Sequence, residues 1–216
     1  MDIGIIGAGT VAQAFARKAI NAGHSITLSN SRGPDSLAEL VADIGHHASA
    51  ASITDAANKP VVLLAVPWPR AEAALREVPA WKGEILIDAT NAFADGTPAE
   101  GLVDFGDGSS SEHVASRARG ARVVKAMNSL FMSHFAAEPG GDRYRRVMFV
   151  SGDDAAARNT VADLFESLGF APVDLGSLKI GGRIQAVGKP IAGHDFFVPW
   201  PAPRTFPAFN GEGSEK

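Results

Sequence analysis

The stretch DIGIIGAGTVAQAFARKAINAG, residues 2–23, carries the clearest structural signal in the chain. Its first five residues, Asp2–Ile6, are short, apolar and rich in isoleucine, which predicts a buried strand. From Thr10 to Ala22 the apolar side chains fall on one stripe at helical spacing, which predicts a helix. Gly23 is typical of a helix end. A buried strand that leads directly into a helix is typical of an α/β sheet.

The link between this strand and this helix is GAGTVA, Gly7–Ala12, which fits the pattern G-x-G-x-x-A. Gly7 permits a sharp turn out of the strand, and Gly9 has no Cβ, so a pyrophosphate can approach the backbone. Ala12 is small enough to let the helix pack close to the sheet. The helix N-terminus would present free N–H groups to the phosphates. The position of the pattern between strand and helix predicts a dinucleotide site. The alternative is a tight turn that binds no ligand.

The second predicted strand, residues 24–30, ends without an acidic residue. Many dinucleotide-binding proteins place a carboxylate there, which binds the ribose 2′-hydroxyl of NAD and would repel a 2′-phosphate. Here the chain offers Asn30, Ser31 and Arg32. The arginine can bind a phosphate through charge-assisted hydrogen bonds, and the other two side chains can add hydrogen bonds. We therefore expect NADP as the cofactor. The alternative is an exposed turn whose arginine binds nothing.

Further strand and helix signals alternate along the chain. Strands are predicted at 61–66, 84–89, 122–126, 146–151 and 172–175, and helices at 36–44, from 112, from 152 to about 168, and at 180–187. This order predicts an α/β fold: a Rossmann-type, doubly wound, mainly parallel sheet with a short C-terminal helical or irregular extension. We expect residues 1–178 to form an NADP-binding domain. We expect residues 179–216 to form a small extension that contributes to an acceptor pocket or a dimer contact.

The composition narrows the classes of function. The 216 residues carry 20 basic and 24 acidic side chains, a net charge of −4, so no basic excess favours nucleic-acid binding. The chain has no cysteine, which excludes disulfides, thiol nucleophiles and cysteine-ligated metals. His46 and His47 have no evident third ligand, so no metal is expected. No apolar run approaches the ~20 residues that span a bilayer, and the fold begins at Asp2, so we expect a cytoplasmic protein without a membrane partner.

Several segments together resemble a known family. They are residues 1–34 and the motifs VVLLAVPW, DATN, GSSSEHVA and RVVKAMNSLF. They are similar to those of the NADP-dependent coenzyme F420 reductase-like proteins, which are related to pyrroline-5-carboxylate reductases and to the cytosolic domains of the STEAP ferric reductases. The resemblance covers residue 1 to about residue 190. It implies an oxidoreductase that passes hydride directly between NADP(H) and a flavin-like ring, for which the deazaflavin F420 is the best-known candidate.

The resemblance also implies roles for single residues. Asn128, Phe131 and Ala92 are departures, because family members often have histidine, proline and proline at these positions. The acceptor is therefore less well indicated than the cofactor. The implied cofactor-binding residues are Gly7, Ala8, Gly9, Thr10 and Val11 in the phosphate loop, Asn30, Ser31 and Arg32 at the 2′-phosphate, Ala65, Val66 and Pro67 over the ribose and pyrophosphate, and Asn91 and Met127 at the nicotinamide rim.

Hydride transfer between two rings needs placement more than acid–base help, so we expect no catalytic dyad. Asn128, His134 and Trp68 are the candidates for the acceptor pocket. Of these, His134 is the best candidate for a titrating group, and Trp68 fits a pocket wall and core packing equally well. Lys125 stands at a strand end, and we do not expect it to act as a catalytic lysine.

Two other interpretations fit the same residues. One is a sensor or scaffold that binds NADP(H) without turnover, since a fold and a cofactor do not establish catalysis. The other is a reductase of a different small acceptor, such as FMN or FAD, a ferric chelate or an imine. An open cavity over the nicotinamide favours an enzyme, and a C-terminal segment that fills this space favours a sensor. The segment with Trp200, Phe206 and Phe209 is expected to form a pocket wall or a contact in a homodimer.

Overall fold

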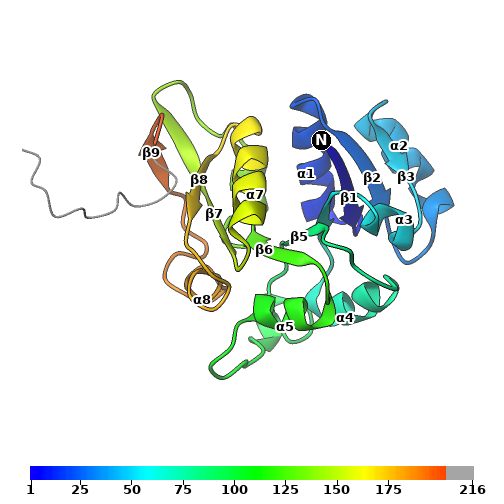
Figure 1. Cartoon of the computed structure of the whole chain (residues 1–216). Coiled ribbons are helices and arrows are strands. Elements are labelled where there is room, and N and C mark those ends of the chain that lie inside the picture. Colours follow the sequence, from blue (N-terminus) through cyan, green and yellow to red (C-terminus); the bar gives the residue numbers. More distant parts are fainter. Residues whose placement is uncertain (203–216) are drawn as a thin grey trace, which may run out of the picture.

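The computed structural model of the chain describes residues 1–202 and builds them around one nine-stranded sheet (Figure 1). Within this range no helix is long and apolar enough to cross a membrane. The strands are β1 (Asp2–Ile6), β2 (Ser25–Ser29), β3 (Ala48–Ala50), β4 (Val61–Leu64), β5 (Ile85–Asp88), β6 (Arg122–Ala126), β7 (Tyr144–Gly152), β8 (Ala171–Asp174) and β9 (Phe197–Pro199). The helices are α1 (Thr10–Asn21), α2 (Ala38–Ile44), α3 (Ile53–Ala57), α4 (Trp68–Arg76), α5 (Ser110–Arg117), α6 (Met132–Ala136), α7 (Ala155–Ser167) and α8 (Gly181–Ile184), with 3₁₀ turns η1 (Pro34–Leu37) and η2 (Pro98–Glu100).

The strand order is β3-β2-β1-β4-β5-β6-β7-β8. The first six strands of this order are parallel, β7 is antiparallel to β6, and β8 is parallel to β7. β9 pairs antiparallel with β7. β2 and β3 lie successively on one side of β1, and the chain then crosses so that β4 pairs with the other side of β1. This is the predicted Rossmann-type fold, and it places the switch point, where open α/β sheets bind ligands, between β1 and β4.

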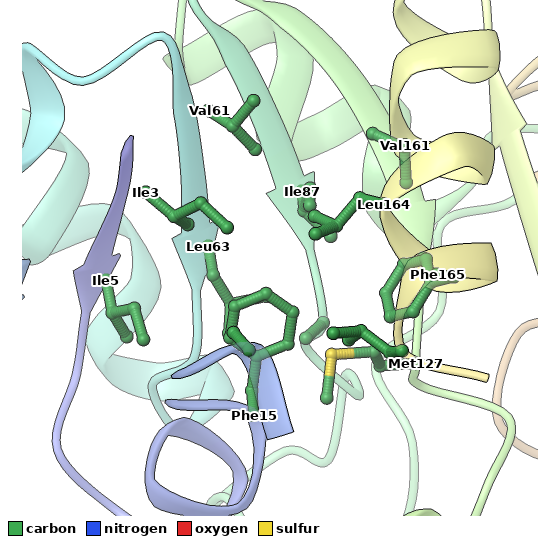
Figure 2. Packing of buried hydrophobic residues seen from close by; sticks show 14 of the residues in the cluster. Ile3, Ile5, Phe15, Val61, Leu63, Ile87, Met127, Val161, Leu164 and Phe165 are labelled. Carbon is green, nitrogen blue, oxygen red and sulfur yellow. The ribbon is translucent and has the colours of Figure 1, made fainter. Parts of the chain in front are cut away.

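Two apolar cores cover the two faces of the sheet. On one face α1, α2 and α7 pack against strand residues that include Val61 and Leu63 of β4. On the other face α3, α4 and α5 pack against residues that include the intervening Val62. Successive residues of β4 therefore enter different cores, which explains the uninterrupted apolar run that predicted this strand. In the first core the rings of Phe15 and Phe165 meet edge to face, with centroids 6.3 Å apart (Figure 2).

The longer predicted elements are present, with small differences at their ends. The strands expected at 2–6 and 122–126 have those bounds. The helix expected at 36–44 begins only at Ala38, because Pro34 first starts a 3₁₀ turn. The helix expected at 180–187 is reduced to α8, which begins with two glycines that stabilise a helix poorly. The sequence did not indicate β3, α3, α6 or β9, because elements of three to five residues are too short to show a period. No helix was predicted at α4 either, although it has nine residues.

The C-terminal extension is described only as far as residue 202. Its described part contains α8, the segment 185–193 and β9. Phe206 and Phe209, which were expected to line a pocket or form a dimer contact, lie outside the described residues. The homodimer therefore stays a prediction.

Candidate functional site

A cavity of about 410 Å³ lies at the switch point, where β1 and β4 end. Its volume is in the range of about 300–1,000 Å³ that is common for small-ligand sites. It brings together three segments that the sequence singled out: the phosphate loop, the end of β2 and the segment after β4. The predicted cofactor residues that line it are Gly7, Ala8, Gly9, Asn30, Ser31, Ala65, Val66 and Pro67.

The two glycines of the phosphate loop are needed for different reasons. Gly7 has a φ of +123°, and a Cβ there would lie 2.2 Å from the carbonyl oxygen of Ala65, so the backbone itself requires glycine. At Gly9 the position that a Cβ would take has no atom of the other described residues within 4 Å, apart from its chain neighbours and the backbone of its own helix. Packing of the protein therefore does not require glycine at this position. The open space over Gly9 fits the predicted approach of a pyrophosphate.

The N-terminus of α1 meets this open space. Gly9 is the N-cap of α1, and no side chain caps the helix. The N–H groups of the first turn of an α-helix have no partner within the helix, and the helix dipole gives them a partial positive charge. An uncapped helix of 12 residues that begins at a cavity wall is a suitable site for a phosphate group.

The turn after β2 is held in shape by its own side chains. Asn30 Oδ1 accepts a hydrogen bond from the Arg32 N–H at 2.9 Å, and Asn30 Nδ2 donates to Ser36 Oγ at 2.9 Å. Ser31 and Arg32 are exposed, and among the described residues neither side chain has a hydrogen-bond or ion-pair partner. Asn30 therefore shapes the turn, while Ser31 and Arg32 are available to a ligand.

Arg70 is a candidate that sequence reasoning missed. It lies in the first turn of α4 and lines the same cavity as Ser31. Its exposed guanidinium has no ion-pair partner within residues 1–202. The signal in the sequence was the segment PWPR at residues 67–70, two residues after the end of β4, since a helix that begins at the switch point brings its first turn to the ligand site. Among the described residues, Arg70 is the arginine that lines this cavity, and the predicted Arg32 lies next to Ser31 but outside the lining.

A second cavity, of about 360 Å³, lies between the start of α1 and the ends of β5 and β6. We call it the acceptor cavity. Val11, Asn91, Met127 and Asn128, all singled out from the sequence, line it together. Phe131 is 60% exposed at this cavity. Apart from Asn91, Asn128 and Ser129, the lining side chains are apolar.

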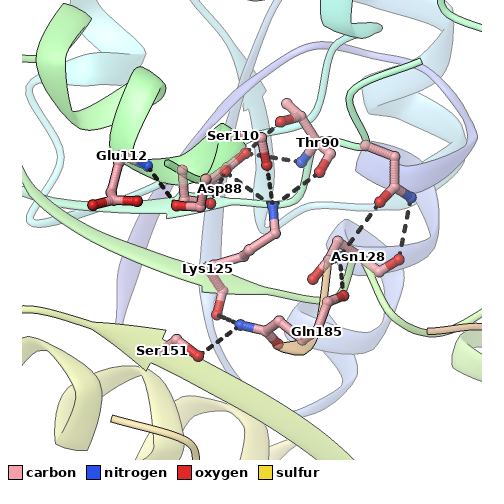
Figure 3. Close-up of polar contacts among 11 residues, drawn as sticks. Asp88, Thr90, Ser110, Glu112, Lys125, Asn128, Ser151 and Gln185 are labelled. Atoms are coloured by element: carbon pink, nitrogen blue, oxygen red, sulfur yellow. Dashed lines mark hydrogen bonds and ion pairs between the residues drawn. The ribbon is translucent and has the colours of Figure 1, made fainter. Parts of the chain in front are cut away.

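A polar contact closes one side of the acceptor cavity, although its two members are 37 residues apart. Asn91 Nδ2 donates to the Asn128 carbonyl at 3.1 Å, and Asn128 Nδ2 donates to the Gln185 carbonyl at 2.7 Å (Figure 3). Asn128 Oδ1 and Ser129 Oγ are buried and have no protein partner among the described residues. A buried polar atom without a partner costs about 1–3 kcal/mol. These two atoms therefore point to a ligand with a polar group at this place.

Met127 has an unusual backbone at the floor of the same cavity. Its φ is +67°, and its side chain is fully buried. A long side chain in this region of φ is uncommon and costs about 1–3 kcal/mol, so the surrounding structure must hold it there. The conformation turns the chain at the end of β6 and leads directly to Asn128 and Ser129. Strain of this kind is often found at ligand sites.

A buried ion pair supports the rim from below. Lys125 Nζ lies 3.3 Å from Asp88 Oδ2 and also donates to the Thr90 carbonyl and to Ser110 Oγ (Figure 3). Burial alone would raise the pKa of Asp88, but the Lys125 ammonium and hydrogen bonds from Ser111 and Thr90 more than offset it, so this pKa lies below its ordinary value. Because its hydrogen bonds are all made inside the protein, Lys125 positions the rim and faces no ligand.

Two of the predicted acceptor-pocket residues lie outside the lining of the acceptor cavity. Trp68 packs edge to face on Phe105, with ring centroids 5.4 Å apart, and lines a separate hollow of about 140 Å³ beside His113. His134 lies next to Asp195, with 4.0 Å between Nδ1 and Oδ2. Of the three candidates, only Asn128 is brought to the cavity wall.

The fold and the phosphate loop define a Rossmann-type dinucleotide-binding protein. The family described as "NADP oxidoreductase coenzyme F420-dependent" matches residues 2–92. A solved structure of a hypothetical protein from Sinorhizobium meliloti is 39% identical, with a TM-score of 0.84 over 91% of this chain and 95% of that chain. A solved candidate F420-dependent NADP reductase from an Arthrobacter species is 30% identical, with a TM-score of 0.72 over 86% of this chain and 90% of that one. The chain belongs to this family of NADP oxidoreductases.

The curated relatives extend the comparison to larger proteins. Metalloreductase STEAP3 of Rattus norvegicus is 28% identical over 186 residues, which are 86% of this chain and 36% of that protein. The chain thus spans about a third of the length of the curated relatives it matches. The family and its relation to the STEAP reductases, which the motifs indicated, are confirmed.

Proposed function

We propose that the chain is an enzyme that transfers hydride between NADP(H) and a planar, flavin-like acceptor bound in the acceptor cavity. The deazaflavin F420 is the first candidate, because the family description names it. The observation that carries the proposal is the acceptor cavity itself, an open and mostly apolar space of about 360 Å³ beside the start of α1. A flat apolar ring suits such a lining.

The residues present fit NADP(H). The open space over Gly9 suits a pyrophosphate, and Ser31, Arg32 and Arg70 suit the 2′-phosphate end of the cofactor. The unpartnered Oδ1 of Asn128 suits a carboxamide N–H of the nicotinamide. When bound, the nicotinamide supplies or accepts the hydride.

The chemistry of the lining supports hydride transfer without proton transfer. Among the described residues that line the acceptor cavity, none is Asp, Glu, His, Lys or Arg. Val11, Ala89 and Met127 offer apolar surface that excludes water, and Asn91 and Asn128 fix the rim. Such a site can place two rings against each other. Among the described lining residues it offers no carboxylic acid, imidazolium or ammonium group that could protonate an imine nitrogen.

The sensor alternative is weakened by the same cavity. A sensor was expected to fill the space over the nicotinamide with its C-terminal segment. Within the described residues, Val187, Gly188, Ala192 and Gly193 line the acceptor cavity and leave it open. An open second site is what a hydride acceptor requires.

A spectroscopic panel tests the proposed function. The protein is mixed with NADPH or NADH and with deazaflavin, FMN, FAD, a quinone, an imine or a ferric chelate, and the nicotinamide absorbance is followed. We expect rapid oxidation of NADPH by the deazaflavin or a flavin, and much slower oxidation of NADH. Turnover with the imine alone, or with the ferric chelate alone, would mean that this compound class, and not a flavin-like ring, is the acceptor. Tight binding of NADPH without turnover on any acceptor would favour the sensor.

A further inference from the structure

A third cavity, of about 280 Å³, lies beside the acceptor cavity and has no part in the function proposed above. The loop 102–110 and the segment 183–189 form most of it. Val187 lines both cavities, and Ala92 lines this one while the residues on either side of it line the acceptor cavity. The two cavities are therefore neighbours, and a ligand with two linked parts can occupy both.

Two buried serines present unused hydroxyl protons to this cavity. Ser109 Oγ accepts from the Glu112 N–H at 3.1 Å, and Ser110 Oγ accepts from the Lys125 ammonium at 3.3 Å. The two serines are only 4% and 6% exposed. Neither hydroxyl donates to any group within the described residues, so each O–H is available to an acceptor on a ligand.

Two cations line the same cavity without partners. Arg183 projects from α8, and Lys189 follows five residues after the end of that helix. Within residues 1–202 neither side chain has an ion-pair or hydrogen-bond partner. Two hydroxyl donors and two free cations around one hollow match a phosphate or a carboxylate, which accepts several charge-assisted hydrogen bonds.

The acidic group of the lining does not cancel this charge. Asp104 is the carboxylate among the described lining residues, and its Oδ1 already accepts the Gly106 N–H at 2.8 Å within its own turn. The lining thus keeps an excess of one positive charge over its acid. Among the described lining side chains, the two serine hydroxyls, Arg183 and Lys189 are unused donors, and Asp104 Oδ2 is an acceptor that remains beside them.

A thin partition separates this cavity from the acceptor cavity. Leu102 lines the third cavity and Gly188 lines the acceptor cavity, and a Cβ at Gly188 would lie 2.7 Å from Leu102 Cδ1. The two residues are thus in direct contact. At this place the wall between the two cavities is formed by the contact of these two residues.

We propose that the third cavity is an anion subsite, which binds a phosphate or carboxylate joined by a short chain to the ring of the acceptor. The proposal rests on the function proposed above, because it assigns the ring to the acceptor cavity. It narrows the substrate class from flavin-like rings in general to rings that carry an anionic side chain.

Riboflavin and FMN test the subsite, because they share one ring system and differ by a phosphate. Binding of each is measured by flavin fluorescence with the NADP-saturated protein, so that turnover is not required. We expect FMN to bind at least about tenfold more tightly than riboflavin, as expected for one or two charge-assisted hydrogen bonds. Arg183→Gln and Lys189→Gln should remove most of this preference and leave riboflavin binding unchanged.

Matched variants and a free anion complete the test. Lys179→Gln and Arg143→Gln change exposed residues outside the cavity and should keep the preference for FMN. Inorganic phosphate should compete with FMN and not with riboflavin. If riboflavin binds more tightly in the presence of phosphate than in its absence, the subsite also takes a free anion. The subsite would be overturned if FMN and riboflavin bound with equal affinity, or if Arg183→Gln weakened the binding of FMN and of riboflavin equally.

If the protein binds neither riboflavin nor FMN, the proposal that its acceptor is a flavin is contradicted. The subsite would then be decided by calorimetric titration of the NADP-saturated protein with inorganic phosphate. Binding that is lost in Arg183→Gln would support the subsite, and no binding would overturn it.

Discussion

At the scale of single residues, Gly7 and Gly9 belong to one motif but have different surroundings. Gly7 lies at a positive φ against the Ala65 carbonyl, so the fold needs it. A Cβ at Gly9 would meet open space at the N-terminus of α1, so packing of the described residues does not require glycine there, and the proposed pyrophosphate would. The motif alone does not separate these two roles, because both glycines belong to one pattern.

This difference can be measured with two alanine variants. Gly7→Ala should lower the free energy of unfolding by about 2–4 kcal/mol, through the strained φ and the clash with a backbone oxygen. Gly9→Ala should cost less than about 1 kcal/mol of stability and weaken NADPH binding at least about tenfold. Denaturant unfolding and an NADPH titration give both quantities. Normal NADPH binding by Gly9→Ala would reject the pyrophosphate site.

A second prediction at this scale concerns the cofactor's 2′-phosphate. Arg32→Ala should weaken NADPH binding by about tenfold, because a hydrogen bond to a charged group contributes about 1.5–3 kcal/mol. NADH lacks the 2′-phosphate, so its binding should barely change. The exposed Arg143 is a matched control, and Arg143→Ala should affect neither cofactor. Equal losses for NADPH and NADH in Arg32→Ala would contradict the assignment.

At the scale of elements, the rim of the acceptor cavity depends on contacts between strand ends. The Asp88–Lys125 pair links the last residue of β5 to β6. Lys125 also donates a hydrogen bond to Ser110, the first residue of α5. Gln185, just after α8, donates to the Lys125 carbonyl and to Ser151 of β7. These contacts keep Asn91 and Asn128 in register at the cavity.

Removal of one member of the buried pair should be costly. Lys125→Met leaves the Asp88 carboxylate buried and uncompensated, which should lower the free energy of unfolding by about 3–5 kcal/mol. The double variant Asp88→Asn/Lys125→Met should lose less than Lys125→Met alone, because no charge is left unpaired. Denaturant unfolding measures each value. Lys179→Met, at an exposed lysine, is the control. If Lys125→Met and Lys179→Met lower the free energy of unfolding equally, the buried pair contributes nothing to stability.

At the scale of the whole molecule, one buried histidine joins parts of the chain that are 143 residues apart. His24 Nδ1 lies 2.8 Å from the Met1 ammonium, and its Nε2 lies 2.9 Å from Ser167 Oγ at the end of α7. Because the ammonium can only donate, Nδ1 accepts and the ring proton is on Nε2. Burial, and then the nearby ammonium, lower the pKa of His24 from its ordinary value of 6.5.

The lowered pKa of His24 predicts how stability depends on pH. The unfolded chain binds a proton on this histidine at a higher pH than the folded chain, so acid favours unfolding. The contribution of His24 is fully present above its ordinary pKa of 6.5 and is lost as the pH falls below that value. Denaturant unfolding from pH 7.5 to pH 5.5 should show this loss in the wild type and in His46→Gln. The loss should be smaller in His24→Gln, and an unchanged pH dependence in that variant would contradict the prediction.

The sequence by itself determined the parts of this protein that are local in the chain. The strand β1, the loop Gly7–Ala12 and the helix α1 follow one another directly, so periodicity and glycine positions were enough to predict them. The absence of a carboxylate after β2 was also readable, because the end of that strand has a known place beside the cofactor. Local patterns encode local geometry, and the Rossmann order of elements follows from their alternation.

Only the tertiary structure decided which residues meet at the acceptor end. Asn128 came to the cavity wall while His134 and Trp68 did not, and Arg70 and Gln185 joined the sites without any motif. These positions depend on strand order, on the positive φ of Met127 and on short elements that show no period. Contacts between residues tens of positions apart result from packing of the whole sheet, and a linear pattern carries no measure of that packing.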